Sequence, residues 1–230
     1  MTTSTLLTRP GGATRARALG RRLSGVERHG ARVAGLALLA MTLISVPASR
    51  LLDATQPWAT GAAGLAFLAV AALDVSAGWG LYLVLSRRAH PAAYAALVSR
   101  VGYAVLLAAS AARLLWPGGA GVEAFRADWD RALVVFGLHL VVLAVALWRS
   151  RLVPRVIVAA TALAGAAYLL DAALARFTDA GWRGALVPVM LGELLLMGWL
   201  LLAGVRRSPG SAPRTAGDAP AVSAASAAGA

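Results

Sequence analysis

Six long apolar runs set the limits on what this 230-residue sequence can fold into. Each run is close to the ~20 residues that a helix needs to cross the ~30 Å hydrocarbon core of a bilayer. A backbone inside hydrocarbon has no water to bond to, so it satisfies its own hydrogen bonds by being helical. We therefore predict an all-α polytopic membrane protein, a bundle of six transmembrane helices. The predicted spans are residues 33–52, 61–86, 94–116, 132–148, 153–175 and 185–205.

The regions outside the apolar runs are polar and differ in character. Residues 1–32 form an Arg-rich tail, and the transmembrane domain occupies residues 33–206. Residues 207–230 are rich in Ser, Pro, Ala and Gly with nothing to bury, which predicts a disordered tail. In the loop at 117–130, Phe125 and Trp129 are four residues apart, a spacing that fits a short helix on the outer surface.

The distribution of positive charge predicts the orientation. The 22 basic residues are all Arg, and the net charge of +12 could suggest a nucleic-acid partner. These Arg residues lie between apolar spans, however, so membrane topology explains them and we exclude nucleic acid. Fifteen lie on the side of the two termini, six lie on the other side, and Arg100 lies within a span. The positive-inside rule then places both termini in the cytoplasm. Four tryptophans fall at the opposite interface, as an aromatic belt should: Trp58, Trp116, Trp129 and Trp182.

The sequence argues against a cleaved export signal and against any site built from cysteine. Arg21-Arg22 and Val46-Pro47-Ala48 resemble parts of a cleaved signal, but the apolar run starts too far from the Arg pair and is long for a signal core. The chain has no cysteine, which excludes disulfides, thiolate metal sites and thiol nucleophiles.

Several short motifs give the membrane region a family resemblance. They are Phe-Gly-Leu-His at 136–139, Trp-Arg-Ser-Arg-Leu-Val-Pro-Arg at 148–155, Gly-Ala-Ala-Tyr-Leu-Leu-Asp at 165–171, and Gly-Glu-Leu at 192–194 followed by Trp-Leu-Leu at 199–201. With these motifs the chain resembles the bacterial six-span membrane family called domain of unknown function 4386. The resemblance implies a six-span integral protein of the bacterial inner (plasma) membrane and carries no assigned activity.

Five ionisable residues lie inside the predicted spans: Asp74, Arg100, His139, Asp171 and Glu193. A charge in hydrocarbon costs several kcal/mol if unpaired, so each should face the bundle interior and have a partner. They could form a solute or proton pathway, or they could hold helices together. Asp171 lies near the outer end of its span, where we expect an interfacial carboxylate close to Arg176.

Helical rise predicts which of these residues share a depth. Asp74 is about 20 Å below the outer end of its span and Arg100 about 9 Å above the inner end of the next, so both lie at the same level of a ~30 Å core. We predict an ion pair between them, with extension of Arg100 to the interface as the alternative. His139 and Glu193 also agree in depth to roughly 2 Å, which predicts a hydrogen-bonded pair.

No catalytic, cofactor-binding or metal-binding residue can be assigned from these patterns. A catalytic zinc site usually offers three protein ligands, and the interior has a single His. Ser76 and Ser99 lie in no recognisable triad motif. Three function classes stay open: a non-enzymatic membrane protein that binds a partner or a lipid, which we favour; a small-solute or proton-coupled carrier; and an intramembrane lipid-modifying enzyme. The expected partners are the bilayer and a protein or small ligand in the bundle interior.

Overall fold

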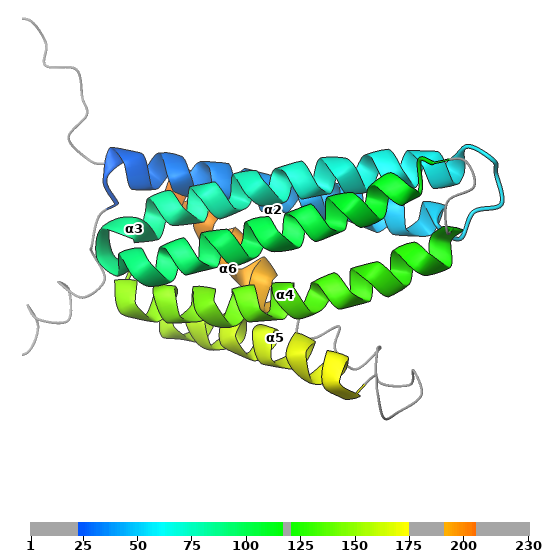
Figure 1. Ribbon diagram of the computed structural model, residues 1–230. Helices are drawn as coiled ribbons and strands as arrows, with labels where there is room; N and C mark the ends of the chain where they lie inside the picture. Colours follow the sequence, from blue (N-terminus) through cyan, green and yellow to red (C-terminus); the bar gives the residue numbers. More distant parts are fainter. Residues whose placement is uncertain (1–22, 117–120, 175–190, 206–230) are drawn as a thin grey trace, which may run out of the picture.

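The structure is a computed structural model that describes residues 23–116, 121–174 and 191–205. Within these residues the chain consists of helices joined by turns and short loops (Figure 1). The helices are α2 (Gly25–Leu51), α3 (Ala59–Arg113), α4 (Gly121–Ser150), α5 (Arg155–Leu174) and α6 (Leu191–Val205). The first four are long and apolar enough to cross a membrane. The all-α membrane fold is therefore confirmed.

Several sequence predictions fall outside the described residues. These include residues 1–22 of the first tail, the whole second tail, and residues 185–190 at the start of the last predicted span. The described α6 has 15 residues and is the shorter apolar helix of the set.

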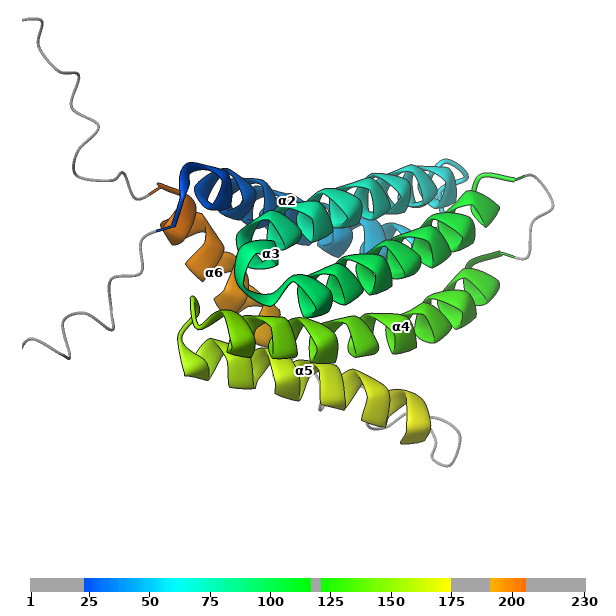
Figure 2. The same cartoon turned by 60° about the vertical axis from the view of Figure 1, so that its left-hand side comes forward.

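Helix α3 is two helices joined by a sharp turn. Its 55 residues would extend roughly 80 Å if straight, far more than a ~30 Å core. At Ala89 the backbone leaves the helical region (φ −144°, ψ 44°), and Pro91, which has no N–H to donate, follows two positions later. We call residues 59–88 the first limb and residues 90–113 the second limb. The chain reverses between them, so the limbs lie antiparallel and side by side (Figures 1 and 2), as predicted for spans 61–86 and 94–116.

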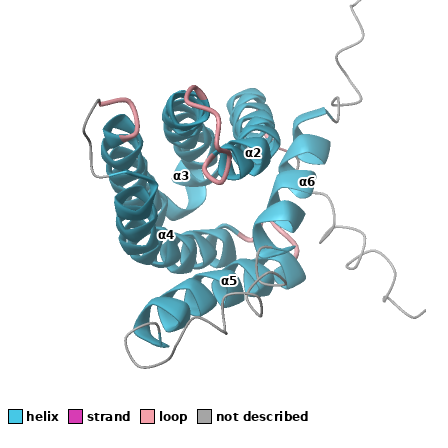
Figure 3. Ribbon diagram, turned by 90° about the vertical axis from the view of Figure 1, so that its right-hand side faces the viewer, coloured by secondary structure: helices cyan, strands magenta, loops and turns pink. Residues whose placement is uncertain are grey.

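The helices close into a ring. Each helix packs against the next in sequence, and α6 packs against α2. Figure 3, a view along the bundle, shows α6 crossing at an angle between α5 and α2. Large apolar side chains cover the outside of the ring, where a membrane would contact them, and among them are Leu36, Leu43, Leu65, Leu163 and Leu202.

Glycines permit close contacts between neighbouring helices. A Cβ atom placed on Gly80 would lie 2.6 Å from the carbonyl oxygen of Gly30, so α2 and the first limb meet backbone to backbone. A Cβ atom on Gly165 would lie 2.8 Å from the carbonyl oxygen of Gly137, where α4 meets α5. Small residues are the usual means of close helix packing in lipid, where lipid tails remove the hydrophobic drive for helix association. Gly137 and Gly165 belong to two of the family-like motifs, and Gly192 of a third meets the backbone of Ala160 where α6 contacts α5.

Two helices begin before the membrane spans predicted for them. Helix α2 begins at Gly25, ahead of the predicted span 33–52, because Ser24 and Glu27 form a reciprocal capping box. Helix α4 runs without a break from Gly121, so the predicted separate surface helix around Phe125 is wrong. Phe125 is helical but fully buried, and its ring lies 4.9 Å from that of Phe67.

Polar and aromatic groups mark the end of the bundle that holds the α2–α3 loop. Arg113 pairs with Asp128 at 2.7 Å, and Arg126 pairs with Asp53. Trp58 and Trp116 are exposed at this end, as an interfacial belt requires. The predicted belt also included Trp129, which here packs its ring against Phe67, and Trp182, which lies outside the described residues.

Candidate functional site

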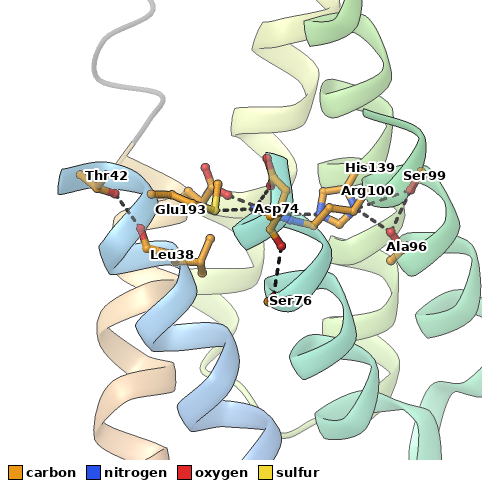
Figure 4. A network of polar contacts seen from close by, with 11 residues as sticks. Leu38, Thr42, Asp74, Ser76, Ala96, Ser99, Arg100, His139 and Glu193 are labelled. Atoms are coloured by element: carbon orange, nitrogen blue, oxygen red, sulfur yellow. Dashed lines mark hydrogen bonds and ion pairs between the residues drawn. The ribbon is translucent and has the colours of Figure 1, made fainter. Parts of the chain in front are cut away.

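Arg100 lies at the centre of the ring and contacts side chains from four directions. It comes from the second limb of α3 and is 1% exposed. Its guanidinium group reaches Asp74 of the first limb, His139 of α4 and Glu193 of α6 (Figure 4). Nη2 also lies 3.9 Å from the sulfur of Met41 in α2. We call Asp74, Arg100, His139 and Glu193 the polar cluster.

The predicted ion pair between Asp74 and Arg100 is confirmed. Nη2 of Arg100 lies 2.7 Å from Oδ1 of Asp74, and Asp74 has no exposed surface. Because the guanidinium is buried in the ring, extension to the interface is excluded. The pair is close but poorly aligned, since neither Asp74 oxygen accepts a hydrogen bond from a described residue. Charge attraction to Arg100 therefore compensates the buried carboxylate.

His139 joins α4 to the second limb as a neutral ring. Nδ1 lies 2.8 Å from the carbonyl oxygen of Ala96, an acceptor, so Nδ1 carries the proton. Nε2 lies 3.2 Å from Nη1 of Arg100, and a guanidinium only donates, so Nε2 accepts. These two contacts fix the tautomer that is protonated on Nδ1.

The predicted pair between His139 and Glu193 is wrong, although their common depth was correct. Glu193 Oε1 lies 3.3 Å from Nη1 of Arg100, the same nitrogen that meets His139. The guanidinium therefore lies between the two side chains and bridges them, and no hydrogen bond joins them directly in the described structure. Depth follows from helical rise, whereas the intervening Arg100 depends on how each helix is rotated.

Ser99 approaches His139 without forming a nucleophile–base pair. Its Oγ lies 3.5 Å from Nδ1 of His139, at the limit of a hydrogen bond. The hydroxyl instead contacts the carbonyl oxygens of Ala95 and Ala96 at 2.9 and 3.1 Å. Since Nδ1 already carries a proton directed at Ala96, it cannot accept the proton of Ser99. This contact offers no activated serine.

Asp171 lies apart from the polar cluster. It is half-buried near the end of α5, and its expected neighbour Arg176 lies outside the described residues. The same helix instead contributes Tyr168, whose ring lies 5.4 Å from that of Phe136.

Aromatic residues around the polar cluster were missed as site residues. Phe136 lies 5.6 Å from the guanidinium carbon of Arg100, and its ring is 4.8 Å from that of Tyr103. Phe136 and Tyr168 lie in the family-like motifs, each one helical turn before a polar residue, His139 and Asp171 respectively. This spacing puts each ring on the same helix face as the polar residue, and it could have identified the two rings from the sequence. Glu27 was also missed; it is 2% exposed and pairs with Arg88 at the opposite end from Trp58.

A cavity of about 460 Å³ opens beside the polar cluster. Five helices line it, mostly with apolar and aromatic side chains, and Glu193 is the cluster member on its wall. Glu193 is 27% exposed, whereas Asp74, Arg100 and His139 are buried behind it. A cavity of this size suits a small organic molecule. Among the described residues no group of three or more His, Asp or Glu side chains could hold a metal ion.

The comparisons with known proteins find a family match for one stretch of the chain. Residues 120–204 match the model of a family described as a domain of unknown function, DUF4386. This match confirms the resemblance over α4, α5 and α6, with His139, Asp171 and Glu193, while Asp74 and Arg100 lie outside it. No curated protein and no solved structure matches the chain. The chain is therefore a helical membrane protein with a family match of unassigned function.

Proposed function

We propose that the chain crosses the bacterial inner membrane six times, with both termini in the cytoplasm. Four helices have the length and hydropathy for a crossing, and the reversal at Ala89 divides α3 into two limbs. Helix α6 would supply the described part of the last predicted crossing, residues 185–205. The greater number of Arg residues at the end that holds Ser24 and Arg88 supports the orientation.

We infer that the protein is a non-enzymatic membrane protein that binds a small amphiphilic, lipid-like molecule inside the ring. The cavity of about 460 Å³ carries this inference, because it joins apolar walls to the partly exposed carboxylate of Glu193. Apolar surface with a few convergent polar groups is the usual character of a ligand site. The buried charges behind Glu193 hold four parts of the ring together and keep that wall in place.

The test is whether the purified protein retains a ligand in this cavity. Val70 lines the cavity, and Val70→Phe would add a ring to it. Val75 lies in the same limb, is 42% exposed on the outside and does not line the cavity, so Val75→Phe is the matched control. Mass spectrometry of small molecules released from the full-length chain should find the same compound in the native protein and in Val75→Phe. Val70→Phe should lose it.

A second variant that fills the cavity shows whether a loss of the compound comes from the filled space or from a folding defect. Thr42 lines the cavity from an exposed position on α2, so Thr42→Phe should reduce the bound compound with little effect on the midpoint of thermal unfolding. The proposal is wrong if no compound is retained, or if both filling variants retain as much as Val75→Phe.

A proton-coupled or solute carrier is the second candidate, favoured by the position of the polar cluster beside the cavity. Ionisable residues that face a cavity within the membrane commonly mark solute and proton pathways. Flux through proteoliposomes that contain the native protein, but not Val70→Phe, would favour the carrier over a binding protein.

A further inference from the structure

We propose that the cavity takes an organic cation, an ammonium group on an apolar or aromatic body, with the ammonium against Glu193. This inference rests on the proposed ligand-binding function and names the chemical class of the ligand. It is argued from the charges on the cavity wall, the balance of charge in the polar cluster and the aromatic rings beside Glu193.

Among the described residues, the charged side chains that line the cavity are acidic. Glu193 and Asp130 lie on the wall, and no described Arg or His lines it. Arg100 approaches the cavity from behind Glu193 but is 1% exposed, so its guanidinium is closed off from the space. A ligand in the cavity therefore meets the carboxylate of Glu193, whose oxygens accept hydrogen bonds and attract cations.

The polar cluster holds one more negative group than positive groups. Asp74 and Glu193 are two carboxylates, and Arg100 is a single guanidinium. His139 adds no charge, because its contacts with Ala96 and Arg100 fix it as a neutral ring. Asp74 makes the shorter contact with Arg100, 2.7 Å against 3.3 Å for Glu193. Glu193 also accepts a hydrogen bond from Nη1 of Arg100, so the two carboxylates share one guanidinium, and Glu193 is the one of the two that faces the cavity.

Aromatic rings complete the setting for a cation. Tyr103, Phe136 and Tyr168 line the cavity with Glu193, and their rings are in contact at 4.8 and 5.4 Å. The negative faces of such rings attract quaternary ammonium groups, and the attraction grows when water is excluded. A carboxylate beside several rings therefore matches an organic cation better than a neutral lipid or an anion.

The test compares three probes that share one phenylbutyl body: the trimethylammonium cation, the neutral alcohol and the sulfonate anion. Binding to the full-length protein in the uncharged detergent dodecyl maltoside would be measured by calorimetry. We expect the cation to bind most tightly. Glu193→Gln removes the charge with little change of shape. It should lower the affinity for the cation by about tenfold or more, because one charge contact is worth roughly that factor. Binding of the alcohol should stay unchanged, which also shows that the variant is folded.

Two further variants separate charge in the cavity from charge elsewhere. Asp171→Asn removes a half-buried carboxylate that does not line the cavity, so binding of the cation should be unaffected. Tyr168→Leu removes a ring from the cavity wall. It should lower the affinity for the cation more than the affinity for the alcohol.

The outcomes distinguish this inference from the proposed function. If the alcohol or the sulfonate binds as tightly as the cation, or if Glu193→Gln leaves the cation unaffected, the cation assignment is wrong while a ligand site remains. If no probe binds and no compound is retained by the native protein, both proposals fail.

Discussion

Arg100 shows how a permanent charge is accommodated within an apolar ring. Arg stays protonated in proteins, so the structure must supply compensating groups. Here Asp74 supplies a fully buried carboxylate, Glu193 a second one, and His139 a lone pair. Each compensating group comes from a different helix or limb, so the same contacts that solvate the charge also tie the ring together.

The energetic link between Arg100 and Asp74 can be measured by a double-mutant cycle. Arg100→Leu leaves Asp74 buried without its cation, and we expect a loss of about 3–5 kcal/mol of unfolding free energy. Adding Asp74→Leu should recover much of that loss, because the stranded carboxylate is then gone. Reversible unfolding in mixed micelles of sodium dodecyl sulfate provides the free energies.

Asp171→Leu serves as the reference in this cycle. Asp171 lies outside the polar cluster, so its effect should add to that of Arg100→Leu. Strict additivity of Arg100→Leu and Asp74→Leu would show that the two side chains do not stabilise each other.

The sequence predicted how deep each polar residue lies in the membrane better than it predicted the direction in which its side chain points. Helical rise is nearly constant, so counting residues placed Asp74 and Arg100 at one level and likewise His139 and Glu193. Direction depends on the rotation of each helix about its axis, which small residues such as Gly30 and Gly80 set through close packing. Counting therefore found the first pair and missed that Arg100 stands between the members of the second.

At the scale of the helices, the lengths of the apolar runs predicted most of the helices but not the residues at which they begin. The reversal between the predicted spans 61–86 and 94–116 was located by the break between two apolar runs, and the structure places it at Ala89, two residues before Pro91. The start of α4 was misjudged, since Phe125 is buried through contact with Phe67 of another helix, which the local sequence does not reveal. The aromatic cavity wall escaped prediction for the same reason, as its rings come from three separate helices or limbs.

The contact between α2 and the first limb of α3 gives a prediction for one glycine. Gly80→Ala would place a Cβ atom 2.6 Å from the carbonyl oxygen of Gly30, and this backbone atom cannot move aside as a flexible side chain would. We expect a loss of about 1–3 kcal/mol, the usual cost of overpacking, seen as a lower midpoint of thermal unfolding.

Gly102→Ala is the matched control for this substitution. Gly102 lies in the second limb, and the nearest atom to its added Cβ would be 3.9 Å away, an ordinary contact. The control should be neutral or slightly stabilising, because Ala is the better helix former. Equal destabilisation by both substitutions would show that the close contact with Gly30 does not govern the effect at Gly80.

At the scale of the whole molecule, the absence of cysteine permits a direct test of topology. Single cysteines at exposed positions can be labelled with a membrane-impermeant maleimide in intact cells. We expect labelling of Thr55→Cys and Ala127→Cys from outside. His90→Cys, Val156→Cys and Val205→Cys should react only after the membrane is permeabilised. Labelling of His90→Cys in intact cells would contradict the two-limb crossing of α3, and labelling of Val205→Cys would contradict the last crossing.

Closure of the ring by its first and last described helices has a consequence for biosynthesis. Arg32 donates from Nε to the carbonyl oxygen of Gly204 at 2.6 Å, across 172 positions of the chain. A ribosome releases the chain from its N-terminus, so α2 is made early and receives this partner only when synthesis is nearly finished. Asp74 and Arg100 belong to one hairpin and can neutralise each other as soon as that hairpin forms. The hairpin can therefore enter the bilayer without a stranded charge, whereas the cavity is complete only after Glu193 arrives with α6.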